Sequence, residues 1–504
     1  MTLGAIAIFW ALVIWAAFSS RPVALYLFFA SIPFGAFAVI PTTLTAGVTF
    51  TATPIVCVLL IAKVLLDRKG PAFLLTTALR PGRLLLLFLF WMIAVVTTLF
   101  MPRLFAGDVR IVPIRGELGE TMALFPTAQN VTQLVYITIS VFTVFAFSRI
   151  LQSRRDRQHA LKALVFGGAV AVITGLIDFA TQFAPIEPFL APLRTASYAM
   201  ATNVDVFGSK RVVGLMPEAS AFGGIVLGML CLLIFFRRVI QHGRVRNLYA
   251  PLVIGGLVLC LWLAKSSGAY VGAGVLVVVI AAEAMLRAFS RGHSGRIYRQ
   301  DLVGEVSVAV GLLVAIGMIV FLRPDVFEPA LNVLDRMVFA KAESGSFEER
   351  GLWRATAFEA LLSTYGLGVG LGGTRSSSSL VAIFASTGVV GGLLYCGFVL
   401  QTLLRRSRHL DWEGQMMLSA FRFAFIPPFV VSLMVGGADF GALNAFGFGI
   451  VTATVISRVN LDRRRQFAAS NRNPRRFVSP PRPSLALARA QRLQLPSPVG
   501  KAPA

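Results

Sequence analysis

Charged residues are scarce in this chain of 504 residues: they make up 14% of it, whereas 56% of the residues are hydrophobic. A soluble globular domain carries about 25% charged residues, and a disordered chain has few apolar ones. The composition therefore excludes both classes. The mean hydropathy of +0.76 is typical of a polytopic membrane protein instead.

Residues for metal or nucleotide chemistry are also few. The chain has four cysteines and four histidines. The cysteines fall in apolar stretches without CxxC spacing, which predicts small core residues rather than disulfides or metal ligands. The sequence has no GxxxxGK[ST] motif for a nucleoside triphosphate and no Asp-x-Asp motif for a metal-bound nucleotide sugar. We therefore expect no cofactor and no metal.

Long apolar stretches predict the fold. A helix needs about 20 apolar residues to cross a bilayer, and a spanning segment must be helical because its backbone groups find no water there. The sequence predicts an all-α polytopic bundle of about 12–13 transmembrane helices over residues 1–457. The predicted spans are 2–18, 23–40, 51–66, 84–101, 130–148, 163–184, 219–236, 249–264, 268–286, 303–322, 378–404, 418–436 and 440–457.

The net charge of +24 would suggest nucleic acid in a soluble protein, but here it follows the membrane. One set of alternate loops holds 33 of the 47 Lys and Arg residues, and the other set holds 13. By the positive-inside rule the first set is cytoplasmic, including the C-terminus, and nucleic acid is not an expected partner. The tail 458–504 is basic and rich in proline, which predicts a disordered cytoplasmic tail near anionic lipid.

The longest outer loop, 323–377, carries several arginines. Within it, residues 349–362 predict a helix that ends at the glycine-rich turn Gly366–Gly373. Arg350 and Arg354 share one face of this helix, with Trp353 beside them, and two guanidinium groups suit a diphosphate. The alternative is that both arginines pair with glutamates on a solvated helix.

A second polar cluster precedes the predicted span 219–236. It contains Lys210, Arg211 and Glu218, and Pro217 with Glu218 suits a helix start. A carboxylate beside a span is costly without a partner, and Arg211 is the nearest candidate for Glu218. Asp178, inside a predicted span, carries the same argument more strongly. Lys265 lies in a tight outer turn.

Three runs resemble a known family. Arg350-Gly-Leu-Trp353-Arg354, then Tyr365-Gly-Leu-Gly-Val-Gly-Leu-Gly, then Ser386-Thr-Gly-Val-Val-Gly-Gly are similar to the signature of the O-antigen ligase/polymerase-like membrane glycosyltransferases. The run from Arg211 to Glu218 is similar to that family's earlier arginine motif. Family ligases commonly place a histidine shortly after the glycine turn, whereas Thr-Arg375-Ser-Ser follows here. This departure resembles the exopolysaccharide-polymerase branch.

The resemblance implies a metal-independent glycosyltransferase in a bacterial inner membrane. It would join undecaprenyl-diphosphate-linked repeat units on the periplasmic face, which makes 323–377 a periplasmic loop. Membrane lipids, a flippase and chain-length or export proteins of the same pathway would be its partners. Two other functions stay open: a ligase that transfers glycan to another acceptor, and a flippase or transporter of lipid-linked oligosaccharide.

The chemistry assigns roles to these residues as hypotheses. Glu218 is the first candidate for a base that accepts the proton of the attacking hydroxyl, and Asp178 is the second. A mechanism without a dedicated base stays open, because the diphosphate is a good leaving group. The predicted catalytic residues are Arg211, Glu218, Arg350 and Arg354, and the predicted substrate-binding residues are Asp178, Lys210, Lys265, Trp353, Gly370, Gly372 and Arg375.

Overall fold

The computed structural model describes residues 2–19, 22–41, 49–114, 120–197, 200–206, 209–289, 345–406 and 410–472. The chain divides into two compact units, residues 1–456 and 457–504. The described part of the first unit consists of helices and two short hairpins. Its site-bearing end is formed by loops and helix starts far apart in the sequence.

The elements in chain order are as follows. Before the first hairpin lie α1 (Thr2–Phe18), α2 (Val23–Ser31), α3 (Ala52–Leu65), α4 (Gly70–Ala78) and α5 (Leu85–Leu104). The first hairpin pairs β1 (Arg110–Ile111) with β2 (Met122–Ala123), and the second pairs β3 (Asp205–Val206) with β4 (Ser209–Lys210). Between the hairpins lie α6 (Ala128–Ile150), α7 (Arg154–Ala180), α8 (Glu187–Leu190) and η2 (Ala191–Leu193). After them come α9 (Ala219–Phe236), η3 (Arg237–Val239), η4 (Val245–Tyr249), α10 (Ala250–Leu263), α11 (Ser267–Phe289), α15 (Gly345–Ser363), α16 (Ser379–Leu403), α17 (Trp412–Met434) and α18 (Gly441–Arg472).

The prediction of an all-α polytopic membrane bundle is confirmed. Among the described residues, eight helices are long and apolar enough to cross a membrane: α5, α6, α7, α9 with η3, η4 with α10, α11, α16 and α17. Three shorter apolar helices are α1, α3 and residues 441–457 of α18. The predicted span 303–322 lies outside the described residues, as do residues 323–344 of the predicted outer loop.

Two predicted segments differ from the structure. The expected span 23–40 is helical only over α2, because Pro33 follows closely after Ser31 and a proline has no N–H to continue the helical hydrogen bonds. The tail expected to be disordered from 458 is helical to Arg472 within α18. Residues 458–472 hold good helix formers such as Arg, Gln and Ala, and the first tail proline is Pro474.

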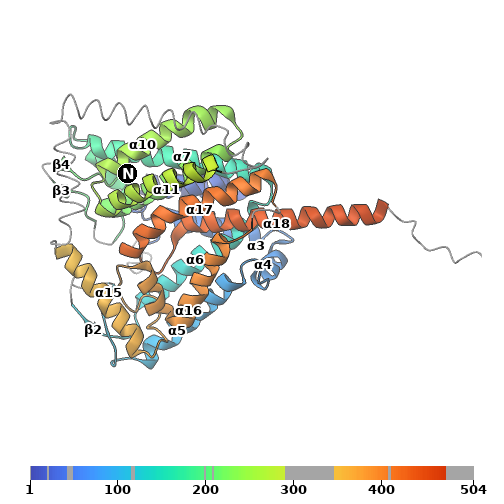
Figure 1. Ribbon diagram of the computed structural model, residues 1–504. Helices are drawn as coiled ribbons and strands as arrows, with labels where there is room; N and C mark the ends of the chain where they lie inside the picture. The colour runs from blue at the N-terminus through green and yellow to red at the C-terminus, as the bar shows by residue number, and fades with distance from the viewer. Residues whose placement is uncertain are drawn as a thin grey trace, which may run out of the picture. The chain divides into compact units, whose positions relative to one another are not determined.

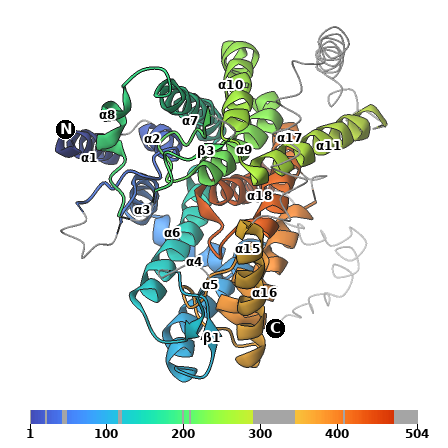
Figure 2. The ribbon, with the colours of Figure 1, turned by 90° about the vertical axis from the view of Figure 1, so that its left-hand side faces the viewer.

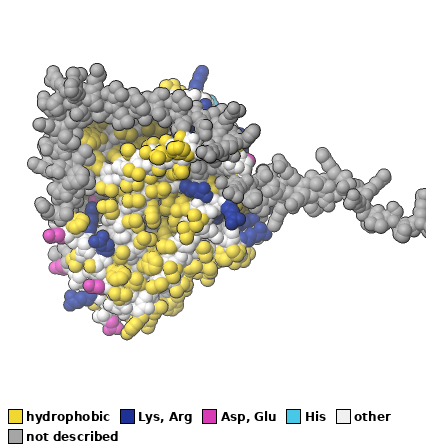
Figure 3. Space-filling model, in the orientation of Figure 1, with side chains coloured by type: hydrophobic (Ala, Val, Ile, Leu, Met, Phe, Trp, Pro, Cys, Tyr) yellow, Lys and Arg dark blue, Asp and Glu magenta, His cyan; other side chains and the backbone are white. Residues whose placement is uncertain are grey.

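The helices pack in two groups. Figures 1 and 2 show α5, α6, α15 and α16 together below α7, α9, α10 and α11. Helix α17 contacts both groups, because it packs on α9, on α11 and on α16. On the face seen in Figure 3, hydrophobic side chains gather in a broad surface with charged side chains toward its margins. Exposed residues such as Val277, Val278 and Leu393 suit contact with lipid.

The glycine-rich turn fits into a break in α16. Gly388 has φ 72° and ψ 179°, which a residue with a side chain rarely adopts, and it interrupts the helix. At this break the Val389 N–H donates to the Gly366 carbonyl at 2.8 Å, and the Val369 N–H donates to the Ala385 carbonyl at 2.8 Å. The turn after α15 is therefore bonded into α16, which fixes the end of α15.

Candidate functional site

A polar cavity of about 240 Å³ lies where α9 and α11 begin and α17 ends. Arg211, Glu218 and Arg350 line it together, although Arg350 lies more than 130 residues after the other two in the sequence. Three of the four predicted catalytic residues thus face one space. The other lining residues are Ala201, Ala219, Ser220, Gly224, Ser266, Ser267, Gly268, Ala269, Val431 and Val435.

Asp178 holds the loop that carries Arg211. Its carboxylate is fully buried and pairs with Arg194 at 2.6 Å and with Lys210 at 3.1 Å. Its other oxygen accepts the backbone N–H groups of Val213 at 2.7 Å and Gly214 at 3.0 Å. With four donors on it, and outside the cavity lining, Asp178 is better placed to position the loop than to bind substrate or accept a proton.

Lys210 acts with Asp178 rather than in the cavity. Its ammonium also donates to the Thr181 hydroxyl at 3.0 Å, near the end of α7. Arg194 donates to the Gly214 carbonyl at 2.6 Å, so it braces the same loop. Arg194 was not predicted as a site residue, because no spacing in the sequence connects it to Asp178. Only the folded loop brings the two together.

Glu218 begins α9 but does not cap it with its side chain. The Ser220 hydroxyl donates to its Oε1, and the side chain remains exposed to the cavity. The predicted helix start is therefore confirmed, whereas a side-chain cap is not what Glu218 supplies. Within the described part of the chain, Glu218 and Arg211 form no ion pair within 4 Å, so the expected pairing is not a direct contact.

Arg211 lies half-buried beside the turn between α10 and α11. Its Nε donates to the Ala264 carbonyl at 3.4 Å. Burial lowers the pKa of Arg211, and the nearby Arg350 lowers it further, whereas Glu218 and Tyr270 raise it. Its guanidinium remains charged at neutral pH. Two cations held near each other in a partly dry cavity favour an anion between them.

Arg350 is held in place through its backbone. Its carbonyl accepts the Ser377 hydroxyl at 2.8 Å, and the Ser377 carbonyl accepts the Gly436 N–H at 2.9 Å. This chain of bonds ties α15 to the end of α17, where the cavity lies. Arg354 is exposed and is not among the cavity-lining residues. Neither arginine forms an ion pair with a glutamate within the residues that the structure describes.

Trp353 and Arg375 form a stacked pair next to this region. The Arg375 guanidinium lies 4.4 Å from the centroid of the Trp353 ring. The backbone N–H of Arg375 donates to the Val112 carbonyl at 2.7 Å. Among the residues that the structure describes, the buried Trp353 indole N–H has no hydrogen-bond partner. A buried donor without a partner is uncommon and suits an acceptor that is not part of the chain. Neither residue is among the cavity-lining residues.

Gly370 and Gly372, predicted to bind substrate, lie against other helices. A side chain on Gly370 would meet the backbone of Thr98 in α5 at 3.0 Å, and one on Gly372 would meet the Gln129 carbonyl in α6 at 2.5 Å. Both have positive φ. The turn thus uses glycine for close packing on α5 and α6.

Lys265 lies beside the cavity in the turn between α10 and α11, with φ 45°. Burial lowers its pKa, and Arg211 lowers it further, whereas Asp205 raises it. The next two residues, Ser266 and Ser267, line the cavity and were not predicted. Their position in the same tight turn as Lys265 was the available signal.

Within the described ranges, no group of three or more His, Cys, Asp or Glu side chains is arranged to hold a metal ion. Comparison of the sequence with protein-family models gives no match. Comparison with curated proteins gives no match either. The candidate site therefore rests on its own geometry.

Proposed function

We propose that this protein is a polysaccharide polymerase that joins undecaprenyl-diphosphate-linked repeat units on the periplasmic face of a bacterial inner membrane. The observation that supports this most is the meeting of Arg211, Glu218 and Arg350 in one polar cavity at the end of a membrane bundle. A diphosphate at a membrane surface needs cations and adjacent apolar helices, and this cavity has both.

In the proposed reaction, an acceptor hydroxyl oxygen bonds to the anomeric carbon of the donor. The bond between that carbon and the diphosphate oxygen breaks, and the diphosphate leaves with the electron pair. Arg211 and Arg350 stabilise the negative charge that grows on it, so catalysis is mainly electrostatic. Glu218 is within the same cavity to accept the hydroxyl proton, or the proton leaves with solvent.

The proposal is tested in a host strain deleted for the gene and complemented with wild type, Arg350→Ala or Arg354→Ala at matched expression. We expect Arg350→Ala to lower polymer yield by about a hundredfold, since removing one group that stabilises developing charge costs that order in rate. Arg354→Ala should lower it less, because Arg354 does not line the cavity. Polymer length and the membrane face of lipid-linked units are measured.

Arg110→Ala is the matched control, because Arg110 is an exposed arginine on the β1–β2 hairpin. It should leave the polymer unchanged. Single repeat units that accumulate on the outer face support the polymerase. Units trapped on the cytoplasmic face contradict it in favour of a flippase. If the deletion strain makes normal polymer but its lipid A or another acceptor lacks the glycan, the result points to the ligase instead.

A further inference from the structure

A larger cavity of about 380 Å³ adjoins the polar cavity. We call it the inner cavity; α3, α6, α9, α17 and α18 all contribute to its lining. Gly224 on α9 lines both cavities, and a side chain added there would meet no atom within 4 Å. The two spaces are therefore neighbours at an open point of α9, and a substrate in one lies next to a substrate in the other.

The two cavities differ in charge. The polar cavity carries Arg211 and Arg350, whereas the described residues that line the inner cavity include one charged side chain, Asp439, and no lysine or arginine. A carboxylate without a cation beside it repels a phosphate but accepts hydrogen bonds from hydroxyl groups. The charges thus separate an anion site from a site suited to neutral hydroxylated groups.

Asp439 lies in the connection between α17 and α18, and its carboxyl can accept further hydrogen bonds from a ligand. Its Oδ1 accepts the backbone N–H of Gly441 at 3.2 Å, and Ser140 lines the same cavity. A carboxylate offers about four lone-pair sites, so the Gly441 N–H leaves room for hydrogen bonds from a ligand. Asp439 is exposed, and it lines the inner cavity.

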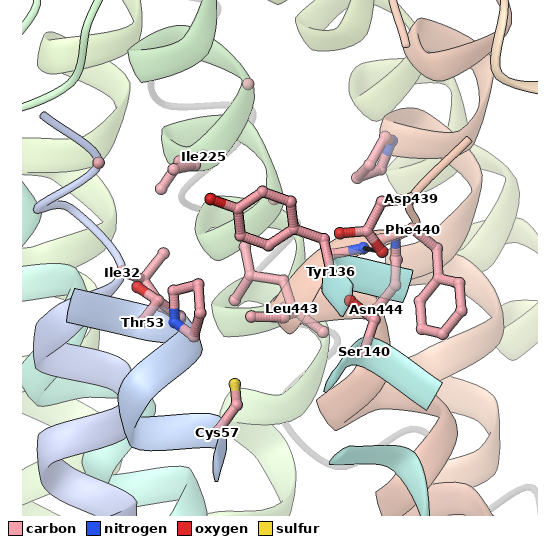
Figure 4. A pocket seen from close by; sticks show the side chains of 18 of the residues that line it. Ile32, Thr53, Cys57, Tyr136, Ser140, Ile225, Asp439, Phe440, Leu443 and Asn444 are labelled. Atoms are coloured by element: carbon pink, nitrogen blue, oxygen red, sulfur yellow. Dashed lines mark hydrogen bonds between the residues drawn. The ribbon is translucent and has the colours of Figure 1, made fainter. Parts of the chain in front are cut away.

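The neighbours of Asp439 suit a sugar ring. Figure 4 shows Asn444, Phe440 and Tyr136 near Asp439, with Thr53 on the opposite wall. Asn444 donates through its amide nitrogen to the Phe440 carbonyl at 2.8 Å, which leaves its amide oxygen as an acceptor. The aromatic rings offer apolar surface. Hydroxyl acceptors and apolar walls together match a saccharide, which has hydroxyl groups at its rim and C–H groups on its faces.

We propose that the inner cavity is the subsite for the acceptor sugar, and that Asp439 accepts a hydrogen bond from one of its hydroxyl groups. This inference rests on the proposed function and adds to it where the second substrate binds. It assigns hydroxyl binding to Asp439 and leaves proton transfer to Glu218. A purely hydrocarbon occupant, such as a lipid chain, would displace water from the exposed Asp439 carboxyl and give it no new partner, which is costly.

The test measures binding of two probes to the full-length protein in lipid nanodiscs. One probe is undecaprenyl diphosphate without sugar. The other is the free repeat-unit oligosaccharide, released by mild acid from the lipid-linked units of the deletion strain. Asp439→Asn and Asn444→Leu should weaken oligosaccharide binding by about tenfold, the loss of one charge-assisted hydrogen bond, and leave undecaprenyl diphosphate binding unchanged. Arg350→Ala should weaken undecaprenyl diphosphate binding and leave oligosaccharide binding unchanged.

Gly255→Ala is the control for both probes, because a side chain there would meet no atom within 4 Å and Gly255 lines neither cavity. If Asp439→Asn and Asn444→Leu weaken undecaprenyl diphosphate instead, the inner cavity holds the lipid chain and the inference is wrong. If wild type binds undecaprenyl diphosphate but no oligosaccharide, the inference alone fails. If wild type binds the oligosaccharide through Asp439 but no undecaprenyl diphosphate, the proposed function fails and the sugar site stands.

Discussion

At the scale of single residues, Asp178 holds in place the loop that carries Arg211 into the polar cavity. It has no exposed surface and joins α7 to the loop 210–214 through two cations and two backbone N–H groups. Because Arg211 follows Lys210 directly, any movement of Lys210 moves Arg211. The residue thus supports the site from outside it.

We expect Asp178→Asn to destabilise the protein by about 3–5 kcal/mol, because it leaves Arg194 and Lys210 buried with their carboxylate partner removed. The midpoint of thermal unfolding in detergent measures this. Asp67→Asn is the matched control, since Asp67 pairs with a single arginine, Arg149, at an exposed position, and its loss should be much smaller. Equal midpoints for the two variants would contradict the structural role of Asp178.

Trp353 offers a second residue-scale test. Its indole N–H is buried without a partner in the described part of the chain, and Arg375 stacks on its ring. Trp353→Phe keeps the ring and removes the N–H. If that N–H donates to substrate, we expect the variant to lose activity by about tenfold while its thermal midpoint stays near that of wild type, since no hydrogen bond within the protein is lost. Unchanged polymer yield would show that the N–H serves no substrate.

At the scale of elements, the break in α16 is what lets the glycine-rich turn enter. A side chain at Gly388 would meet the carbonyl oxygens of Leu367 at 2.6 Å and Gly366 at 2.7 Å, so only glycine leaves space for the turn. The break therefore couples two elements: the conformation of one residue in α16 sets where α15 ends and hence where Arg350 lies.

Gly388→Ala should cost about 1–3 kcal/mol from backbone conformation alone, and more from overlap, because its Cβ would lie 2.6 Å from the Leu367 carbonyl oxygen. We expect lower polymer yield together with a lower unfolding midpoint. Gly255→Ala, in the exposed face of α10, is the control and should change neither. A variant at Gly388 with wild-type stability and activity would rule out this coupling.

At the scale of the whole molecule, the alternating charge of the loops predicts which side of the membrane the cavity faces. The side with 33 Lys and Arg residues should be cytoplasmic. A fluorescent protein fused to the C-terminus should then fluoresce, and alkaline phosphatase fused there should be inactive. The opposite pattern would place the polar cavity on the cytoplasmic side and would contradict the proposed periplasmic reaction.

Much of this architecture is predictable from the sequence, because the length of an apolar run decides whether it can span a bilayer. The helix of Arg350 and the start of α9 after Glu218 follow from local signals as well. The shortened α2 was not predicted, because Pro33 ends the helix within an apolar run. The helical start of the tail was not predicted either, because a run of good helix formers precedes the first tail proline. The bonds between Asp178 and Arg194 could not be predicted, because they depend on how the loop 194–214 folds back on α7.

The polar cavity is assembled from parts made at very different times during synthesis. Arg211 and Glu218 emerge early, whereas the Gly436 N–H that completes the link through Ser377 to Arg350 lies near the end of α17. A chain whose translation stops before α17 can enter the membrane but lacks one wall of the cavity. Unfinished copies in the membrane are therefore expected to lack a complete site.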